Sequence, residues 1–422
     1  MRRYNGEKFM HWFTMKEGVL HADSIPLPDI ASRHGTPTYV YSRKTLERHV
    51  DTIDGAFERI DHLTCYSVKA NTAAGVLKVF ADRGLGADIV SGSELYRVLR
   101  AGIPADRIVF SGVGKTEDEM RYALESGILM FNVESESELH VLNRVAAETG
   151  VKAPISFRVN PDVDPKTHPY MATGLKKSKF GIPQTEAIRL YETAASLEFV
   201  NVIGIDAHIG SQLTDVSPYR EAAERLASLV GDIRACGIDI DIIDIGGGLG
   251  INYEEEFPPD PSDWAEMVVP VLKRTGCRLI LEPGRSIVGN AGVLLTRVLY
   301  IKENGDKTFL VLDSAMNDML RPTLYGSHHS IVPVVERDAE RRIVDIVGPI
   351  CESGDFLARD REIVMPREGD LLAVMSAGAY GMTMSSNYNS RLRAAEVLVY
   401  NDDIRLITRR ETIEDLVARE LM

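Results

Sequence analysis

A lysine at the end of an apolar run is the first residue in this chain that could do chemistry. Lys69 follows Leu63–Val68, a short stretch rich in β-branched and aromatic residues that predicts a buried strand. In an α/β protein, the carboxyl end of a parallel strand opens into a ligand site. An amine that is partly desolvated there loses its proton more easily and can form a Schiff base with a carbonyl compound. A solvated lysine that ends a strand is the simpler alternative.

Three further groups also follow apolar runs. Glu282 comes after Arg278–Leu281, and a buried carboxylate there needs a cation, such as a pyridinium N–H or an arginine. The Gly246–Gly248 run could bring backbone N–H groups against a phosphate, or it could form a tight turn. His208 could be a core residue, an acid or base, or a flat ring stacked on an aromatic ligand. An amine nucleophile, a phosphate cradle and a carboxylate for a ring nitrogen together describe a pyridoxal phosphate site.

The elements that must position these residues are eight short apolar runs that alternate with stretches of helical spacing. This alternation predicts parallel strands joined by right-handed crossovers, and eight units favour a TIM (β/α)8 barrel over an open sheet. We expect the barrel to occupy residues 35–288, with its active site at the carboxyl ends of the strands. The expected strands are Thr64–Val68, Ala87–Val90, Ile108–Phe110, Leu129–Val133, Ile155–Val159, Val202–Ile209, Ile240–Ile245 and Arg278–Leu281.

The rhythm changes after the barrel, where strand-like runs follow one another with few helical segments between them. Residues 289–422 are therefore expected to form a second, mostly antiparallel β domain, a barrel or sandwich. Residues 1–34 contain short β-like runs and are expected to join it. The expected strands of this domain are Val293–Val298, Phe309–Leu312, Ile331–Val335, Ile343–Val347, Leu371–Met375 and Ala395–Val399.

Composition excludes several classes of partner. The net charge of −14 argues against nucleic acid or an anionic membrane, although a few local arginines can still bind an anionic small molecule. No apolar stretch approaches the roughly 20 residues that span a bilayer, and the N-terminus lacks the apolar core of a signal peptide. Four cysteines in 422 residues form no disulfide framework and have no zinc spacing, so we expect no metal and a cytoplasmic location.

Motifs along nearly the whole chain resemble the fold-type III pyridoxal phosphate-dependent decarboxylases, and within them the diaminopimelate decarboxylase family. The barrel and the β domain both contribute to the resemblance, which is specific in the combination of its motifs. These motifs are Tyr66–Asn71, Gly86–Leu95, Thr173–Gly181, His208–Gln212, Asp244–Gly248, Glu282–Ser286, Arg321–Gly326, Cys351–Asp355 and Gly378–Gly381.

The resemblance implies a role for each motif residue around pyridoxal 5'-phosphate. Lys69 would form the Schiff base, Glu282 would pair with the pyridine nitrogen, and His208 would stack on the ring. Cys351 would return the proton after carbon dioxide leaves, as a thiol general acid. The remaining cofactor contacts would come from Ser211, Gly246, Gly247, Gly248, Pro283, Gly284, Arg285 and Tyr380.

The implied substrate is meso-2,6-diaminopimelate, which would be converted to L-lysine and carbon dioxide in the last step of lysine biosynthesis. The far end of this molecule is a zwitterion and needs both a cation and an anion. Arg285, Arg321 and Tyr325 resemble the family's carboxylate binders, Glu352 resembles its amine acceptor, and Tyr380 also reaches this wall. Family members are homodimers with active sites at the interface, so the same is expected here.

Several alternatives differ from this interpretation in one element each. Ornithine, arginine, lysine or carboxynorspermidine decarboxylases would keep the cofactor site and change the substrate wall. Ornithine decarboxylases typically have aspartate and glycine after the cysteine, where this chain has Glu352–Asp355. An alanine-racemase-like enzyme usually has an arginine where Glu282 stands, and a Schiff-base aldolase leaves the glycine loops unexplained.

Three further points bear on this interpretation. A non-catalytic cofactor-binding homologue would have no need of Lys69, Cys351 and Glu352. Asp206-Ala207 replaces the second histidine and the cysteine that many family members have before His208. His328 and His329 are adjacent, so on an extended segment they point to opposite sides, and we expect no metal site there.

Overall fold

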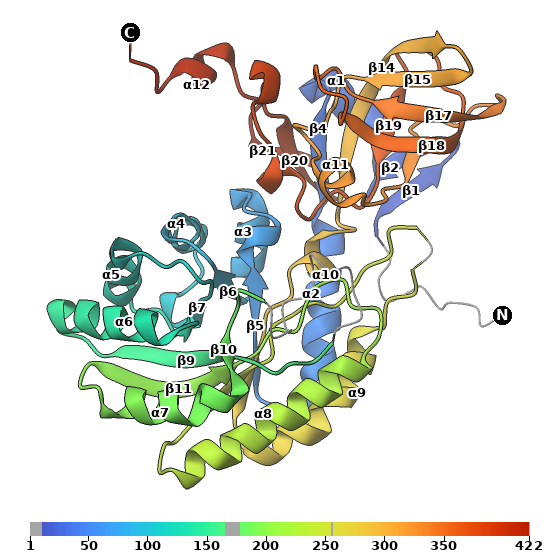
Figure 1. The fold of residues 1–422 in the computed structure, drawn as a ribbon. Coiled ribbons are helices and arrows are strands. Elements are labelled where there is room, and N and C mark those ends of the chain that lie inside the picture. The colour runs from blue at the N-terminus through green and yellow to red at the C-terminus, as the bar shows by residue number, and fades with distance from the viewer. Residues whose placement is uncertain (1–10, 165–177, 255, 422) are drawn as a thin grey trace. The chain divides into compact units, whose positions relative to one another are not determined.

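The structure is a computed structural model that describes residues 11–164, 178–254 and 256–421. The chain divides into two compact units. The barrel domain comprises His49–Ile251 and Phe257–Ser286, and the β domain comprises Met1–Arg48, Asn252–Glu256 and Ile287–Met422. Figure 1 shows the elements of both units.

The barrel domain is built on a nine-stranded sheet that closes on itself through the pairing of β8 with β9. The two-residue strand β10 (Ile182–Pro183) pairs with β9, and the other eight strands form a ring in which every pair is parallel. This confirms the predicted TIM barrel. The ring strands are β5 (His62–Ser67), β6 (Gly86–Ile89), β7 (Ile108–Phe110), β8 (Met130–Val133), β9 (Ala153–Asn160), β11 (Val200–Asp206), β12 (Ile242–Asp244) and β13 (Arg278–Leu281).

Helices connect these strands, and local sequence signals set their ends. In α5, Thr116 and Glu119 form a capping box, and Gly127 ends the helix in the left-handed conformation. The helices are α2 (Arg43–Phe57), α3 (Ala74–Asp82), α4 (Gly92–Ala101), α5 (Glu117–Ser126), α6 (Glu136–Thr149), α7 (Ala187–Ser196), α8 (Ser217–Ala235), α9 (Pro261–Leu272) and α10 (Arg285–Val288), of which α2 begins in the β domain. No helix in the described part of the chain is long and apolar enough to cross a membrane.

The β domain contains a mostly antiparallel sheet in the order β18-β17-β15-β14-β4-β20-β21, with β19 and β16 joined through β14. A three-stranded sheet, β1-β2-β3, precedes it. The strands are β1 (Phe13–Lys16), β2 (Val19–Ala22), β3 (Ile25–Pro26), β4 (Thr38–Ser42), β14 (Gly292–Asn304), β15 (Lys307–Leu312), β16 (Ile331–Pro333), β17 (Arg341–Val347), β18 (Phe356–Val364), β19 (Leu371–Val374), β20 (Ala395–Tyr400) and β21 (Asp403–Thr408). The helices are α1 (Leu27–His34), α11 (Arg321–Tyr325) and α12 (Ile413–Val417).

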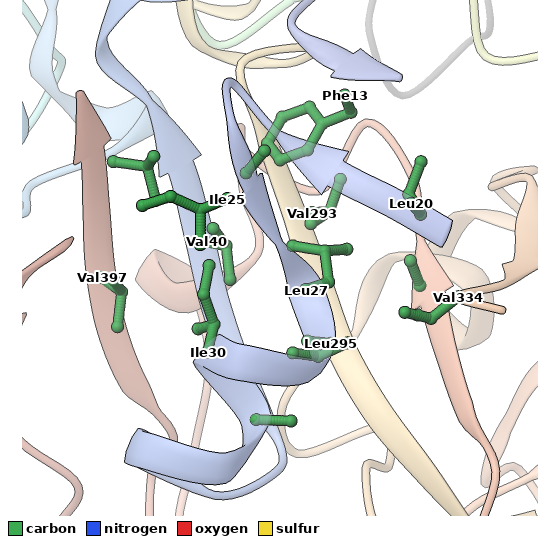
Figure 2. Packing of buried hydrophobic residues seen from close by; sticks show 14 residues of the cluster. Phe13, Leu20, Ile25, Leu27, Ile30, Val40, Val293, Leu295, Val334 and Val397 are labelled. Atoms are coloured by element: carbon green, nitrogen blue, oxygen red, sulfur yellow. The ribbon is translucent and has the colours of Figure 1, made fainter. Parts of the chain in front are cut away.

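One apolar cluster joins the N-terminal segment to this sheet. Leu27 and Ile30 of α1 pack with Val40 of β4 and with Val293 and Leu295 of β14, and all five side chains are fully buried (Figure 2). The burial of these side chains removes apolar surface from water and holds the first strands to the β domain. The predicted membership of the N-terminal strands in the β domain is confirmed.

The structure corrects three details of the sequence prediction. Segment 35–288 was expected to be barrel throughout, but β4 pairs with β14 and β20 and so belongs to the β-domain sheet. Strands β18 and β21 were not predicted. Both lie at the edges of the main sheet and carry charged residues, as edge strands often do, so their apolar pattern is weak. The expected strand Val202–Ile209 ends at Asp206, and His208 lies in the following loop.

Candidate active site

Lys69 lies just beyond the carboxyl end of β5. The strand ends at Ser67, and the short 3₁₀ turn Val68–Ala70 carries the lysine, whose side chain is 39% exposed. Its Nζ donates to Oδ2 of Asp88 at 2.9 Å, and Asp88 on β6 is completely buried. The Ser67 hydroxyl donates to the same carboxylate oxygen at 2.8 Å. The lysine amine is therefore held at the strand ends by an inward-facing carboxylate.

Glu282 follows β13 on the same ring of strands and is only 5% exposed. Its Oε1 lies 3.4 Å from the Ser111 hydroxyl and 3.5 Å from Asn132 Nδ2, both of which can donate to it. Burial, followed by the nearby negative charge of Asp88, raises the pKa of Glu282 to about 7. The charged form of Glu282 would thus be stabilised by a cation brought to it.

Two more carboxyl groups lie beside Glu282. Asp206 ends β11 and Asp244 ends β12, and one carboxylate oxygen of each lies within 4.8 Å of one of Glu282. Burial raises the pKa of both aspartates well above the usual value. Asn132 Nδ2 lies 3.4 Å from Asp244 Oδ2, so this amide bridges Asp244 and Glu282.

The glycine loop after β12 is packed too tightly for side chains. A Cβ on Gly247 would lie 2.1 Å from the carbonyl oxygen of Glu282, and one on Gly248 would lie 2.1 Å from that of Gly210. The Gly246 N–H donates to Asp244 Oδ1 at 2.8 Å, and the Gly247 N–H donates to His208 Nδ1 at 3.2 Å. These two N–H groups have partners inside the protein, so the phosphate role of the loop stays a prediction.

His208 is tied to this loop in one tautomer. Because Nδ1 accepts from the Gly247 N–H, the neutral ring carries its proton on Nε2. The residue keeps some exposed surface, yet desolvation of its ring, followed by the positive charges of Arg158 and Lys69, lowers its pKa well below the usual value. His208 is therefore a neutral, flat ring at the mouth of the barrel.

The segment after Glu282 also lies at the mouth of the barrel, beside the end of β5. The carbonyl of Pro283 accepts from the Ser67 N–H at 3.1 Å, and a Cβ on Gly284 would lie 3.0 Å from the Cβ of Ser67. Arg285 is 7% exposed, and its Nη2 donates to the Ser211 hydroxyl at 3.2 Å. The predicted phosphate residues Ser211 and Arg285 are thus in contact.

The β domain carries the remaining predicted residues, and Arg321 is the most firmly held of them. It is 3% exposed at the start of α11. Its Nη1 donates to the Tyr253 hydroxyl at 2.8 Å and lies 3.0 Å from Nε2 of His329, and its guanidinium stacks over the Tyr253 ring. His329 Nδ1 donates to the Met375 carbonyl at 2.9 Å, which leaves Nε2 to accept from the arginine.

His329 and Tyr253 therefore orient a predicted substrate residue, a role that sequence reasoning missed. His328 instead lies 2.8 Å from Glu254 and 2.9 Å from Arg361, so the two histidines do face different partners. The eight-residue spacing between Arg321 and His329 carries no periodic signal that would identify the contact.

The other predicted residues of the β domain lie on loops or short turns. Cys351 and Glu352 are exposed, and the Cys351 N–H donates to Asn389 Oδ1 at 2.7 Å. Tyr325 ends α11, and Tyr380 adopts a positive φ of 55°. The part of the Thr173–Gly181 motif before Ser178 lies outside the described residues.

Sequence reasoning assigned no individual role to Asp88, Asn132, Asp244 and Arg158, although all four lie in or at the ends of the predicted barrel strands. Arg158 on β9 is 3.1 Å from Glu134, and both are buried. A signal for these residues was available, because a charged or amide side chain inside an apolar strand must find a partner. The partner itself could be identified only once the order of the strands in the ring was known.

The residues of the barrel rim fit pyridoxal phosphate. An amine at the mouth, a buried carboxyl group whose charged form needs a cation, a neutral flat imidazole and a glycine loop closed to any Cβ match the carbonyl, ring nitrogen, ring face and phosphate of that cofactor. The fold and these residues define the class of barrel-type pyridoxal phosphate enzymes. Residues 43–289 match the family model of the pyridoxal-binding domain of pyridoxal-dependent decarboxylases.

Full-length relatives specify the family. The chain is 50% identical to diaminopimelate decarboxylase of Aquifex aeolicus, over 98% of this chain and 99% of the relative. It is 52% identical to that of Vibrio cholerae, over 97% and 99%. The crystal structure of diaminopimelate decarboxylase from Helicobacter pylori complexed with L-lysine superimposes with a TM-score of 0.90 at 41% identity, over 93% of this chain and 99% of that one. The chain belongs to the diaminopimelate decarboxylase family.

Gly247 provides a test of the glycine loop. We expect Gly247→Ala to weaken pyridoxal phosphate binding about tenfold or more, because the added methyl group would collide with the Glu282 backbone and displace the loop. Titration of the cofactor-free protein, followed by visible absorption, measures this. Gly231→Ala is the matched control, since a Cβ in that part of α8 meets nothing within 4 Å. Wild-type cofactor affinity in Gly247→Ala would show that the glycine loop takes no part in cofactor binding.

The pKa of Glu282 predicts how the stability of the cofactor-free protein depends on pH. The pKa of about 7 means that the folded chain holds this proton up to about pH 7, whereas an unfolded glutamate releases it near the usual value of 4.5. The stabilisation from this proton is therefore complete below pH 4.5, and it is lost as the pH rises through the folded-state pKa of about 7. We expect the melting temperature to fall across this window and Glu282→Gln to flatten the fall, as followed by circular dichroism. The exposed Glu192→Gln should keep the wild-type slope, and an unchanged slope in Glu282→Gln would contradict the assignment.

Proposed function

We propose that this chain decarboxylates meso-2,6-diaminopimelate to L-lysine and carbon dioxide with pyridoxal phosphate as cofactor. The observation that carries the proposal is Lys69 at the barrel mouth, held by buried Asp88, in a chain about half identical to diaminopimelate decarboxylases over its full length. The lysine-bound structure of the H. pylori relative supports lysine as the product.

In this proposal the barrel residues hold and polarise the cofactor. Lys69 would hold its carbonyl carbon covalently, Glu282 would pair with the ring nitrogen and His208 would contact the ring. Ser211, Gly284 and Arg285, with the Gly246–Gly248 loop, surround the phosphate, as suggested by the contact between Arg285 and Ser211 and by the closed packing of the loop. The bound cofactor supplies an electron sink for the electrons left when carbon dioxide departs.

The β-domain residues then recognise the substrate and handle the proton. The Cys351 thiol is exposed and is proposed to donate a proton to the carbon that lost carbon dioxide. Arg321, oriented by Tyr253 and His329, is proposed to bind the distal carboxylate, with Tyr325 and Tyr380 beside it. Glu352 is proposed to accept the distal ammonium group. These two opposite charges suit a zwitterionic end, which ornithine lacks.

Assembly and location follow the family in this proposal. We infer a homodimer in which Cys351 and Glu352 complete the partner's site, a geometry that suits their exposure in a single chain. The four free cysteines support a reducing, cytoplasmic compartment.

The substrate assignment is tested by direct competition. Carbon dioxide release and lysine formation are measured with meso-diaminopimelate, and ornithine, arginine and lysine are added as competitors. We expect turnover of diaminopimelate and little of the others, because only diaminopimelate offers Arg321 a distal carboxylate. Turnover of ornithine at an equal or greater rate would overturn the assignment.

Arg321→Lys tests the substrate wall separately. We expect KM for diaminopimelate to rise about tenfold or more, because a lysine cannot reproduce the planar fork held by Tyr253 and His329. Cofactor affinity, read from visible absorption, should be unchanged. Arg405→Lys, at a 69% exposed arginine, is the matched control. Loss of cofactor binding in Arg321→Lys would show that Arg321 supports the cofactor rather than the substrate, and would contradict its assignment.

A further inference from the structure

The three carboxyl groups of Asp206, Asp244 and Glu282 form a cluster of like charges in the barrel. They end neighbouring strands or follow them, their oxygens lie within 4.8 Å of one another, and their exposures are 1%, 0% and 5%. Full ionisation of such a cluster is costly, because each carboxylate loses its hydration and repels the other two.

The nearby cations already have carboxylate partners. Lys69 pairs with Asp88 at 2.9 Å, and Arg158 pairs with Glu134 at 3.1 Å. The neighbouring His208 is neutral, since desolvation lowers its pKa well below the usual value. Among the described residues, the charges that face the cluster therefore leave an excess of carboxyl groups, and at least one member of the cluster must retain a proton.

The contacts of Asp244 identify it as the group that holds this proton. Its Oδ1 accepts from the Gly246 N–H at 2.8 Å, and its Oδ2 lies 3.4 Å from Asn132 Nδ2. The proton of the neutral group is placed on Oδ2, the oxygen with the longer contact, because the oxygen of a carboxyl O–H can donate one hydrogen bond and still accept another. Its side chain is also hydrogen-bonded to that of Glu282. Two carboxyl groups can share a hydrogen bond only when one of them is protonated. In the proposed cofactor role Glu282 must be ionised to pair with the ring nitrogen, so the shared proton belongs to Asp244, whose pKa burial raises above its usual value.

We propose that Asp244 is a positioning residue that remains protonated, donates its O–H to Glu282 and thereby holds Glu282 ionised and oriented toward the cofactor's ring nitrogen. Its other oxygen fixes Gly246, so one side chain links the ring-nitrogen carboxylate to the glycine loop. The inference rests on the proposed cofactor role of Glu282. This role of Asp244 differs from a purely structural role because it requires a neutral side chain that offers one hydrogen-bond donor and one acceptor.

An asparagine meets this requirement and provides the test. In Asp244→Asn, the amide oxygen can accept from Gly246 and the amide N–H can donate to Glu282, with no change of charge. We expect the pH titration of the visible band of the lysine-bound cofactor, and the affinity of the cofactor-free protein for pyridoxal phosphate, to match wild type. Asp244→Leu, which has no donor, should bind the cofactor about tenfold more weakly or worse. Thermal unfolding of the cofactor-free variants shows that each is folded.

Asp88→Asn is the matched control for the loss of one buried negative charge. Asp88 is ion-paired with Lys69, so its neutralisation should move the titration of the visible band to lower pH. If Asp244→Asn moves the band in the same way, Asp244 is ionised and the proposal is wrong. The variant Glu282→Gln tests the cofactor role of Glu282 independently of the proton on Asp244. An unchanged visible spectrum and cofactor affinity in that variant would overturn the role of Glu282 itself, whatever Asp244→Asn does.

Discussion

Among the residues that the structure describes, the mouth of the barrel buries more carboxyl groups than cations, and the chemistry of the site depends on that imbalance. Asp88, Glu134, Asp206, Asp244 and Glu282 are all at most 6% exposed, and Lys69 and Arg158 are the cations that pair with members of this set. Buried carboxyl groups must be neutralised by protons or by cations brought from outside. In the proposed function, a protonated ring nitrogen beside Glu282 would be such a cation, and the amine of Lys69 would attach the ring that carries it. The cofactor would then complete the charge balance of the barrel.

Arg321 in the β domain illustrates a related constraint with the opposite charge. This arginine is 3% exposed and is oriented by the neutral groups Tyr253 and His329. Neutral acceptors fix the plane of a guanidinium without cancelling its charge, so the group keeps its affinity for a carboxylate. The buried tautomer of His329, set by the Met375 carbonyl, is part of this arrangement. Specificity in the proposed function thus depends on residues that need not touch the substrate.

Sequence reasoning succeeded where a property is local and failed where it depends on pairing. Lys69 and Glu282 each follow an apolar run, and that position alone places them at the strand ends of a barrel. The partners Asp88 and Asp244 lie on other strands, so their roles depend on the order of the ring. Strand β4 was assigned to the barrel because its pairing with β14 joins segments about 250 residues apart in the chain, which no local pattern reveals.

The most direct test of the account is the identity of the lysine that carries the cofactor. The holoenzyme is reduced with sodium borohydride, digested and analysed by mass spectrometry. We expect a pyridoxyl group on the peptide that contains Lys69, and we expect this group to be lost in Lys69→Ala. A pyridoxyl group on another lysine, such as the buried Lys115 that is ion-paired with Glu138, would contradict it.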